Sequence, residues 1–178
     1  QYTPGAGHNV LQLGTAEPEG PADAGELVCL PGWQRSGAVA PITVDRLDAA
    51  GGDVSVDVSA GYDRLERWRR RVTWTADALR VVDDVALAEP DTDIVLFRWH
   101  LGTDVEVSIA GSGREFVVAW PEASLTIEGS APLTVSQCPW PDNTVSCTGG
   151  REPLHTCLVV RSTNPERGLN LTTTVTAK

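Results

Sequence analysis

The chain has 178 residues, of which 41% are hydrophobic, and this is enough for one domain with a proper core. Its 14 basic and 24 acidic side chains leave a formal net charge of −10, which repels polyanions at long range and argues against nucleic-acid binding. No apolar run approaches the roughly 20 residues that span a bilayer, and the sequence shows no signal-peptide pattern of a basic end followed by an apolar stretch. We therefore expect no membrane partner, and we expect a processed chain or a fragment.

The first feature along the chain is the segment YTPGAGHNVLQLG at residues 2–14. His8 and Asn9 come just before an alternating apolar run that is typical of a strand. Asparagine tolerates unusual backbone angles, so the pair favours a turn that opens the strand. His8 could equally be one ligand of a site whose other members lie elsewhere. The segment EPEGPADAG, residues 17–25, predicts an exposed loop.

A two-residue alternation of apolar and polar side chains runs through the rest of the chain, as a half-buried strand requires. Short turns rich in Gly, Pro and Asp separate the alternating runs. The pattern predicts an all-β protein, a single domain over residues 1–178 folded as an antiparallel two-sheet β-sandwich of about a dozen strands. The clearest predicted strands lie within residues 53–59, 79–82, 94–99, 105–109, 125–127 and 169–175.

The densest positive charge lies in RLERWRRRVTW. The overlapping stretch GYDRLERWRRR is the best helical candidate, but it continues directly into a strand pattern. On a strand, Arg67, Arg69 and Arg71 share one face, whereas Trp68 and Arg70 share the other. Guanidinium groups match carboxylates, so the first face is a candidate binding ladder for an acidic polysaccharide. The alternative is a solvated face whose arginines pair with aspartates of neighbouring strands.

Six tryptophans are many beside two phenylalanines and two tyrosines. Trp33 and Trp140 lie in the Pro-rich segments LPGWQ and CPWPD, which we expect to be loops. These two rings are therefore candidates for contact with a sugar or a partner. Trp68, Trp74 and Trp99 lie within predicted strands, and we expect them to fill the space between the sheets.

The four cysteines form no C-x-x-C pair, so zinc-knuckle and thioredoxin-like readings fail. An even number suits disulfides. Cys138 and Cys147 flank the turn-rich segment PWPDNTVS and are the first predicted pair, which leaves Cys29 for Cys157 by elimination. Four buried thiols in a reducing compartment are the alternative. Paired cysteines predict an extracytoplasmic protein, either secreted, periplasmic or on the cell surface.

Local motifs of known chemistry do not occur. The chain has no Gly-rich phosphate loop, no G-x-S-x-G elbow and no H-E-x-x-H motif. His8, His100 and His155 are too far apart in sequence to form a local metal motif. Asp83 and Asp84 are adjacent, so on a strand their carboxylates face opposite ways. The residues therefore predict no self-contained catalytic centre.

The order of these segments resembles the C-terminal sandwich of the heparinase II/III-like polysaccharide lyases, over roughly residues 6–162. The resemblance lies in GHNVLQLG, VSVDVSAGYDRLERWRRRVTW, LRVVDDVAL and VLFRWHL, which follow one another in the family's order. Two features depart from the family pattern. Val10 stands where relatives usually carry Thr or Ser, and the CPWPDNTVSC loop has no counterpart that we can place. Because of these two departures, the resemblance identifies neither the subfamily nor the substrate.

The resemblance implies an activity for the intact protein. Family members cleave uronic-acid polysaccharides by β-elimination, in which a base removes the C5 proton next to the carboxylate. This step needs neutralisation of the developing dianion and Tyr or His groups within hydrogen-bond reach. In the family most of these residues lie on a helical toroid ahead of the sandwich, and this chain lacks it. The resemblance thus implies a domain that is inactive without the toroid, with an acidic polysaccharide and the toroid as partners.

Two residues near the N-terminus match family positions. His8 is similar to a ligand of a structural zinc, whose other ligands in relatives are a histidine and an aspartate upstream. One imidazole does not make a zinc site, so we expect zinc only in the intact lyase and no cofactor for this chain alone. Tyr2 lies near the place where some relatives carry an active-site tyrosine, and it is the candidate catalytic residue.

A second hypothesis is a free-standing carbohydrate-binding or cell-surface module that uses Trp33, Trp140 and the arginine strand. A third is a structural sandwich without a ligand. A large apolar patch near the N-terminus would favour the lyase domain, because an abandoned domain interface leaves one. A tryptophan-lined groove in a polar surface would favour the module.

Overall fold

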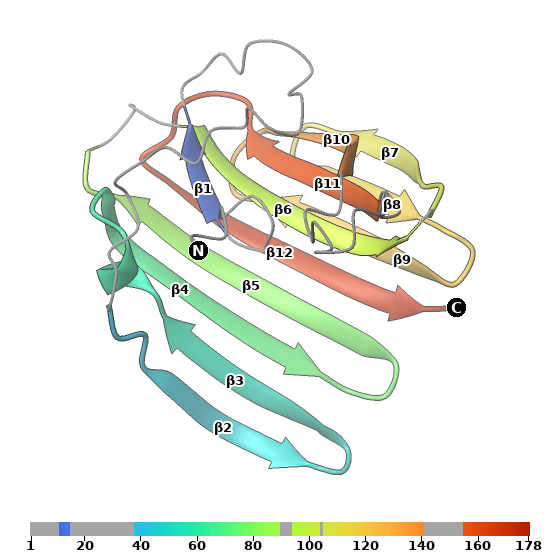
Figure 1. The fold of residues 1–178 in the computed structure, drawn as a ribbon, viewed down its shortest axis with the longest axis horizontal. Coiled ribbons are helices and arrows are strands. Elements are labelled where there is room, and N and C mark those ends of the chain that lie inside the picture. The colour runs from blue at the N-terminus through green and yellow to red at the C-terminus, as the bar shows by residue number, and fades with distance from the viewer. Residues whose placement is uncertain (1–10, 15–37, 90–93, 104, 141–154) are drawn as a thin grey trace, which may run out of the picture.

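The computed structural model describes residues 11–14, 38–89, 94–103, 105–140 and 155–178. Their strands form two antiparallel sheets, which confirms the predicted β-sandwich (Figure 1). The small sheet has four strands in the order β1-β6-β11-β10, and the large sheet has eight in the order β2-β3-β4-β5-β12-β9-β8-β7. The elements are β1 (Leu11–Gly14), β2 (Ile42–Asp48), β3 (Gly51–Asp57), the 3₁₀ turn η2 (Ser59–Gly61), β4 (Leu65–Trp74), β5 (Ala78–Leu87), β6 (Ile94–Thr103), β7 (Ser108–Ser112), β8 (Glu115–Ala119), β9 (Ala123–Gly129), β10 (Leu133–Trp140), β11 (His155–Ser162) and β12 (Gly168–Ala177).

The core lies between the two sheets. The alternating pattern of each strand sends one set of side chains to this inner face and the other set outward. The small sheet contributes Leu11, Phe97 and Val160, which are cross-strand neighbours and fully buried. From the large sheet, Leu171 and Leu125 are buried equally well. The burial of these two sets explains why the alternation was visible in the sequence.

Most predicted strands are confirmed, and two differ in extent. The strand expected over residues 53–59 ends at Asp57, because the chain turns at Ser59–Gly61. The run at residues 105–109 was expected to be a strand throughout, but β7 begins only at Ser108. Val107 packs against the core without joining a sheet, and the hydroxyl of Thr156 donates to the carbonyl oxygen of Val105 at 2.7 Å. A side-chain donor thus takes the place of a strand partner at this point.

The best helical candidate is a turn followed by a strand. The 3₁₀ turn Ser59–Gly61 reverses the chain, and β4 then runs antiparallel to β3. Asp57 accepts hydrogen bonds from the backbone N–H and the hydroxyl of Ser59, at 3.1 and 2.5 Å. The same hydroxyl oxygen accepts the N–H of Trp68 at 2.9 Å. These side-chain contacts compete with helix formation and favour the turn.

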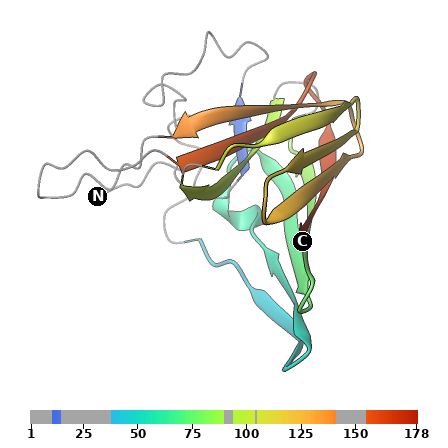
Figure 2. The same ribbon diagram turned by 90° about the vertical axis from the view of Figure 1, so that its right-hand side faces the viewer.

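The large sheet extends beyond the small one. In Figure 1 the small sheet lies over the upper part of the molecule, and β2 and β3 lie clear of it at the lower left. The view from the side shows the same extension below the paired layers (Figure 2). Side chains on the inner face of this extension form what we call the apolar overhang: Ile42, Val44, Leu47, Val54, Val56, Val72 and Trp74.

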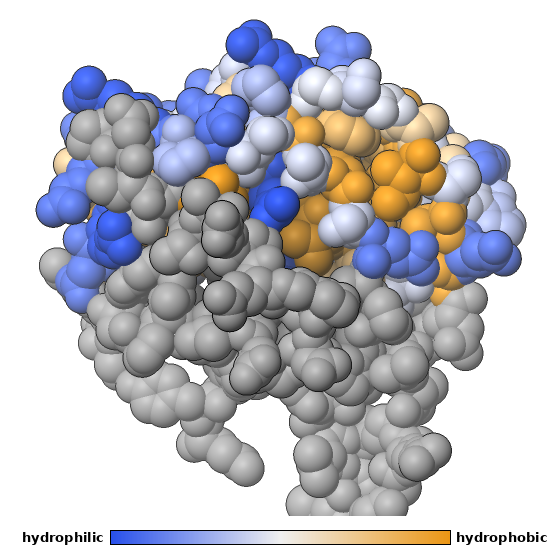
Figure 3. Space-filling view, turned by 90° about the horizontal axis from the view of Figure 1, so that it is seen from above, coloured by the Kyte–Doolittle hydropathy of each residue, from blue (hydrophilic) through white to orange (hydrophobic). Residues whose placement is uncertain are grey.

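The apolar overhang is exposed to solvent. Ile42, Val44 and Leu47 on β2 are 68%, 56% and 68% exposed. Trp74 is half-buried because its indole lies over Gly52, where an added Cβ would come within 2.2 Å of the ring. Hydrophobic side chains are also visible on the face seen from above (Figure 3). The overhang differs from isolated exposed residues in that it continues the inner face of a sheet.

Candidate functional site

The three arginines of the predicted ladder share the outer face of β4, as the alternation indicated. Each guanidinium pairs with an aspartate on a neighbouring strand. The pairs are Arg67 Nε with Asp84 Oδ2 at 2.7 Å, Arg69 Nε with Asp57 Oδ2 at 3.1 Å, and Arg71 Nε with Asp53 Oδ1 at 2.8 Å. The structure therefore shows the cross-strand pairing that the sequence left open as the alternative.

These pairs shift the pKa values of their members in the direction that favours charge. Hydrogen bonding to Arg71 holds the pKa of the Asp53 carboxyl below its usual range. Hydrogen bonding to Asp84 raises the pKa of Arg67. A polysaccharide carboxylate would have to displace an aspartate to reach such a guanidinium. Binding of an acidic polysaccharide by Arg67, Arg69 and Arg71 remains a prediction, and this geometry does not favour it.

Asp57 gives a pH-dependent stability that can be measured. Hydrogen bonds from Ser59, and then from Arg69, lower the pKa of Asp57 in the folded protein. The resulting stabilisation is present above the pKa of the unfolded state and is lost as pH falls through the lower folded value, between about pH 5 and pH 2. We expect Asp57→Asn to be less stable at neutral pH and to lose less further stability on acidification. Urea unfolding at a series of pH values tests this, and parallel pH profiles for the two proteins would contradict it.

A second charged pair lies on the inner face, and the sequence did not reveal it. Asp83 is fully buried and accepts three hydrogen bonds. Two come from Arg70, from Nε at 2.7 Å and Nη2 at 3.0 Å, and one comes from the indole N–H of Trp68 at 2.7 Å. Asp84 points the opposite way, as the sequence predicted for this doublet. The sequence placed Arg70 and Trp68 on one face but could not give the register that brings Asp83 beside them.

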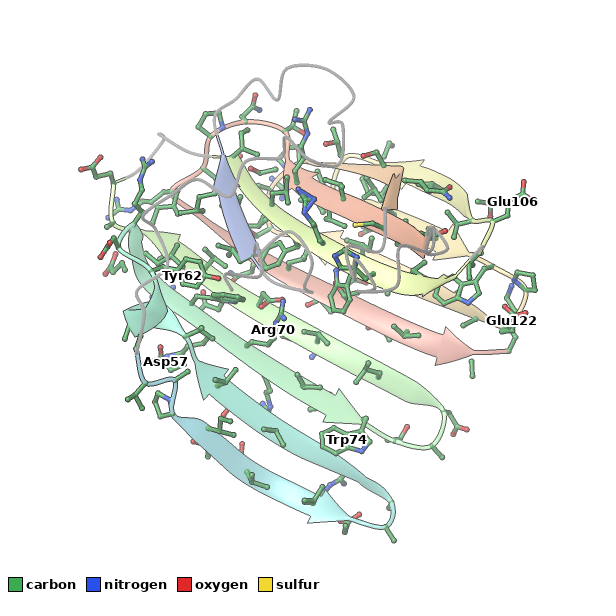
Figure 4. All side chains as sticks on the ribbon, in the orientation of Figure 1. Asp57, Tyr62, Arg70, Trp74, Glu106 and Glu122 are labelled. Atoms are coloured by element: carbon green, nitrogen blue, oxygen red, sulfur yellow. The ribbon has the colours of Figure 1, made fainter. Side chains whose placement is uncertain are left out.

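Aromatic rings surround this pair. The guanidinium carbon of Arg70 lies 5.4 Å from the ring centre of Trp68 and 5.9 Å from that of Trp99. Tyr62, which Figure 4 labels, meets Trp68 edge to face, with 5.2 Å between the ring centres. Trp68 and Trp99 are therefore inter-sheet residues, as expected, whereas Trp74 lies in the apolar overhang. The cluster fixes β4 and β5 beneath β6, and its charged groups are engaged with each other instead of facing a groove.

A hollow of about 650 Å³ opens at the other end of the large sheet, near the labelled Glu106 and Glu122 in Figure 4. Its lining includes Trp120 and both carboxylates, and the Lys178 ammonium donates to the carbonyl oxygen of Trp120 at 2.6 Å. The carboxylates of Glu106 and Glu122 outnumber the Lys178 ammonium in this lining, and they repel a uronate or a sulfate. This groove therefore suits a neutral sugar better than an acidic one.

Comparison with known proteins identifies the family. The profile of the family described as "Heparinase II/III-like, C-terminal" matches residues 5–165. The chain belongs to this family. The resemblance noted from the sequence is thereby confirmed.

Solved structures of heparinase II/III-like enzymes share the fold. Heparan sulfate lyase HepC from Pedobacter heparinus aligns with 76% of this chain and 21% of its own, with a TM-score of 0.56 at 12% identity. A crystal structure of heparinase III gives the same coverages, with a TM-score of 0.55 at 15% identity. The chain thus spans about a fifth of the length of these enzymes, and identities this low show only the fold. No curated protein sequence matches the chain.

Several residues singled out in the sequence lie outside the described residues: Tyr2, His8, Cys29, Trp33 and Cys147. The structure thus does not place the candidate catalytic residue Tyr2, the candidate sugar contact Trp33, or His8, which resembles a zinc ligand of the intact lyases. In the described ranges, no three His, Cys, Asp or Glu side chains gather closely enough to hold a metal ion. These described residues therefore do not make up a zinc site. No helix in the same ranges is long and apolar enough to cross a membrane.

Trp140 and Cys138 are described only through their backbone. Trp140 is the last residue of β10 and lies opposite His155, so the expectation of a loop at this position is wrong. Cys138 lies opposite Cys157 in the same strand pair, and Cys157 is buried. The predicted pairs Cys138–Cys147 and Cys29–Cys157 remain predictions.

Proposed function

We propose that this chain is the C-terminal sandwich of a polysaccharide lyase that cleaves uronic-acid polymers by β-elimination. In this proposal the sandwich packs against the catalytic part of the enzyme and is inactive alone. The apolar overhang is the observation that carries the proposal. Family membership supports it, and so does the much greater length of the enzymes that share the fold.

The overhang has the composition of an interface. Ile42, Val44 and Leu47 lie on the same face of one strand and expose apolar surface to water. Burying this surface against another protein surface would be favourable by about 25 cal/mol per Å². Contiguous apolar patches of this kind mark contact with another protein surface. A free-standing module would be expected to carry polar side chains here, as the outer face of the same strands does with Asp53 and Arg71.

The described residues do not supply the chemistry of β-elimination. The reaction needs a base, an acid and donors that neutralise the substrate carboxylate, all converging on one sugar. Tyr62 is buried, and its hydroxyl donates to the carbonyl oxygen of Leu11 at 3.4 Å. Arg67, Arg69 and Arg71 are engaged by aspartates. We infer that the catalytic groups belong to the part of the enzyme that precedes the sandwich in the family.

We further propose an acidic, uronate-containing polysaccharide as the substrate. The Pedobacter heparinus enzyme that shares the fold is a heparan sulfate lyase, and this makes heparan sulfate the first polymer to test. A polymer of this size lies outside the cytoplasm, so the proposal also implies an extracytoplasmic enzyme. Oxidised cysteine pairs would agree with that location.

An ultraviolet assay for the unsaturated uronate product tests the proposal. Heparan sulfate and other uronate polymers are incubated with the 178-residue chain and, separately, with the lyase that includes its catalytic part. We expect product only from the longer protein. Product from the 178-residue chain would show that the catalytic groups lie within it. A longer protein that cleaves none of the polymers would contradict the lyase assignment.

The groove beside Trp120 supports a second candidate, a carbohydrate-binding module. Glycan-array binding by the 178-residue chain distinguishes the two functions, with Trp120→Ala as the variant. If the chain is the sandwich of a lyase, we expect no glycan binding that depends on Trp120. Binding of neutral glycans that Trp120→Ala abolishes would favour the module instead, because aromatic rings stack on sugar faces.

A further inference from the structure

We propose that the outer face of the large sheet carries a binding site for one acidic sugar unit, in which Arg46 and Arg80 hold a carboxylate or a sulfate group. The site lies where β2 turns into β3 and β4 turns into β5, and these two hairpin ends are side by side at the lower right of Figure 1. The inference takes its class of ligand from the proposed function. It goes further because the site binds a sugar without cleaving it, so the 178-residue chain has this property by itself.

The position of the site follows from a pocket of about 290 Å³ at these hairpin ends. Four of its lining residues form one row across β2, β3, β4 and β5, in which each residue is directly opposed to the next: Arg46, Asp53, Thr73 and Arg80. Directly opposed residues share a face of the sheet, and Asp53 lies on the outer face with the arginine ladder. The two arginines therefore flank the pocket from both ends of the row, three strand spacings of about 4.8 Å apart.

The charge of these two arginines is not neutralised in the way that the ladder is. In the part of the chain that the structure describes, Arg80 is exposed and forms no ion pair. Arg46 contacts Asp48 at 3.7 Å, with both side chains 51% exposed, and solvent screens such a pair. Asp53 is the one carboxylate among the described lining residues, and both of its oxygens are engaged by Arg71. The pocket thus has an excess of positive charge, although the whole chain has a net charge of −10.

Neutral hydrogen-bond donors complete the lining. Thr73 and Thr75 each contribute a hydroxyl group. The Oγ1 of Thr75 accepts the backbone N–H of Asp77 at 3.3 Å, so its hydroxyl hydrogen remains available to a ligand. Guanidinium groups bind carboxylate and phosphate oxygens, and a sulfate ester presents its oxygens in the same way as a phosphate. A sugar that carries one such group and several hydroxyls matches this set of donors.

The size of the pocket limits the ligand. A volume of about 290 Å³ lies at the lower end of the range for small-molecule pockets, so it suits one sugar unit better than a longer segment of a polymer. An acidic polysaccharide would therefore contact this end of the sheet through a single charged unit. The site is distinct from the ladder of Arg67, Arg69 and Arg71, whose guanidinium groups are occupied by aspartates.

A nuclear magnetic resonance titration of the isotope-labelled 178-residue chain tests the inference. At about 0.1 M salt the Debye length of about 10 Å screens distant acidic residues but leaves contacts inside the pocket effective. The probes are an oligogalacturonate, which has carboxylates without sulfate, a dextran sulfate oligomer, which has sulfates without carboxylate, and a neutral cello-oligosaccharide. We expect at least one acidic probe to shift the amide signals of Gly52, Thr73 and Arg80, and the one that binds more tightly identifies the recognised group. Binding of neither acidic probe at these residues, or equal binding of the neutral probe, would overturn the inference.

Three variants show whether the two arginines bind the probe. Arg80→Gln should weaken binding at least about tenfold, because a hydrogen bond to a charged group is lost. Arg46→Gln should also weaken it, and this variant serves if Arg80→Gln does not fold. Arg114→Gln makes the same change of charge in the exposed turn between β7 and β8 and is the matched control. We expect it to change the affinity by less than about twofold, because salt screens charges that are more than a Debye length apart.

Unchanged binding in both pocket variants, or an equal loss in Arg114→Gln and Arg80→Gln, would overturn the inference. The second result would mean that the overall charge of the protein decides binding. The ultraviolet assay for cleavage is read separately, so a chain that binds no acidic probe would remove this site and leave the lyase assignment in place.

Discussion

Replacement of Asp83 by alanine is expected to destabilise the sandwich by about 3–5 kcal/mol, because it leaves the Arg70 guanidinium without its buried counter-charge. The Asp83 side chain is 1% exposed, and it accepts hydrogen bonds from both Arg70 and Trp68. The indole N–H of Trp68 would lose its acceptor in the same variant, which adds to the loss. Urea unfolding followed by tryptophan fluorescence measures the change.

The neighbouring residue provides the control. Asp84 makes the same kind of pair with Arg67, but on the outer face, where solvent screens it. Asp84→Ala should therefore have a far smaller effect than Asp83→Ala. Replacing both partners, in Arg70→Met with Asp83→Leu, should recover much of the lost stability, because an apolar pair needs no counter-charge. Equal losses for the two single aspartate variants would contradict the assignment of Asp83 as a buried partner.

Truncation of Phe97 to alanine should cost about 3–5 kcal/mol, through lost apolar burial and the cavity that remains. Phe97 is 1% exposed on β6 and lies opposite Leu11 of β1 and Val160 of β11. The change therefore loosens the central strand of the small sheet where it packs on the large one. Chemical denaturation of the purified 178-residue chain gives the change in the free energy of unfolding.

Val117→Ala is the comparison for this variant. Val117 lies on β8 and is 45% exposed, so it loses little burial. We expect a change within about 0.5 kcal/mol, as for most surface substitutions. If Phe97→Ala were as mild as Val117→Ala, the small sheet would not pack on the large one as described.

Local pattern was enough to predict the strands. Val54 and Val56 alternate with polar residues in β3, whose apolar face belongs to the overhang, and Leu169 and Leu171 do the same in β12, whose apolar face packs on the core. The same rule placed Arg67, Arg69 and Arg71 together on one face. It failed at residues 105–107, where a side-chain hydrogen bond from Thr156 holds the segment outside a sheet.

The partners of these side chains were not predictable from the pattern. Arg69 pairs with Asp57 across 12 positions of sequence, and Arg71 pairs with Asp53 across 18. Such pairs depend on the register between strands, which shifts at bulges such as the one between Leu65 and Arg67. A ladder that could have bound a substrate carboxylate is therefore occupied by the protein's own aspartates.

The sequence by itself determined the strand class, the side of the sheet on which each charged or apolar residue lies, and the family to which the order of motifs belongs. These follow from local alternation, which requires no knowledge of distant neighbours. Only the tertiary structure decided that Asp83 is a buried partner of Arg70 and that Ile42, Val44 and Leu47 lie beyond the small sheet. Both depend on how strands far apart in sequence are paired and layered, and the periodicity of a single strand carries no information about that arrangement.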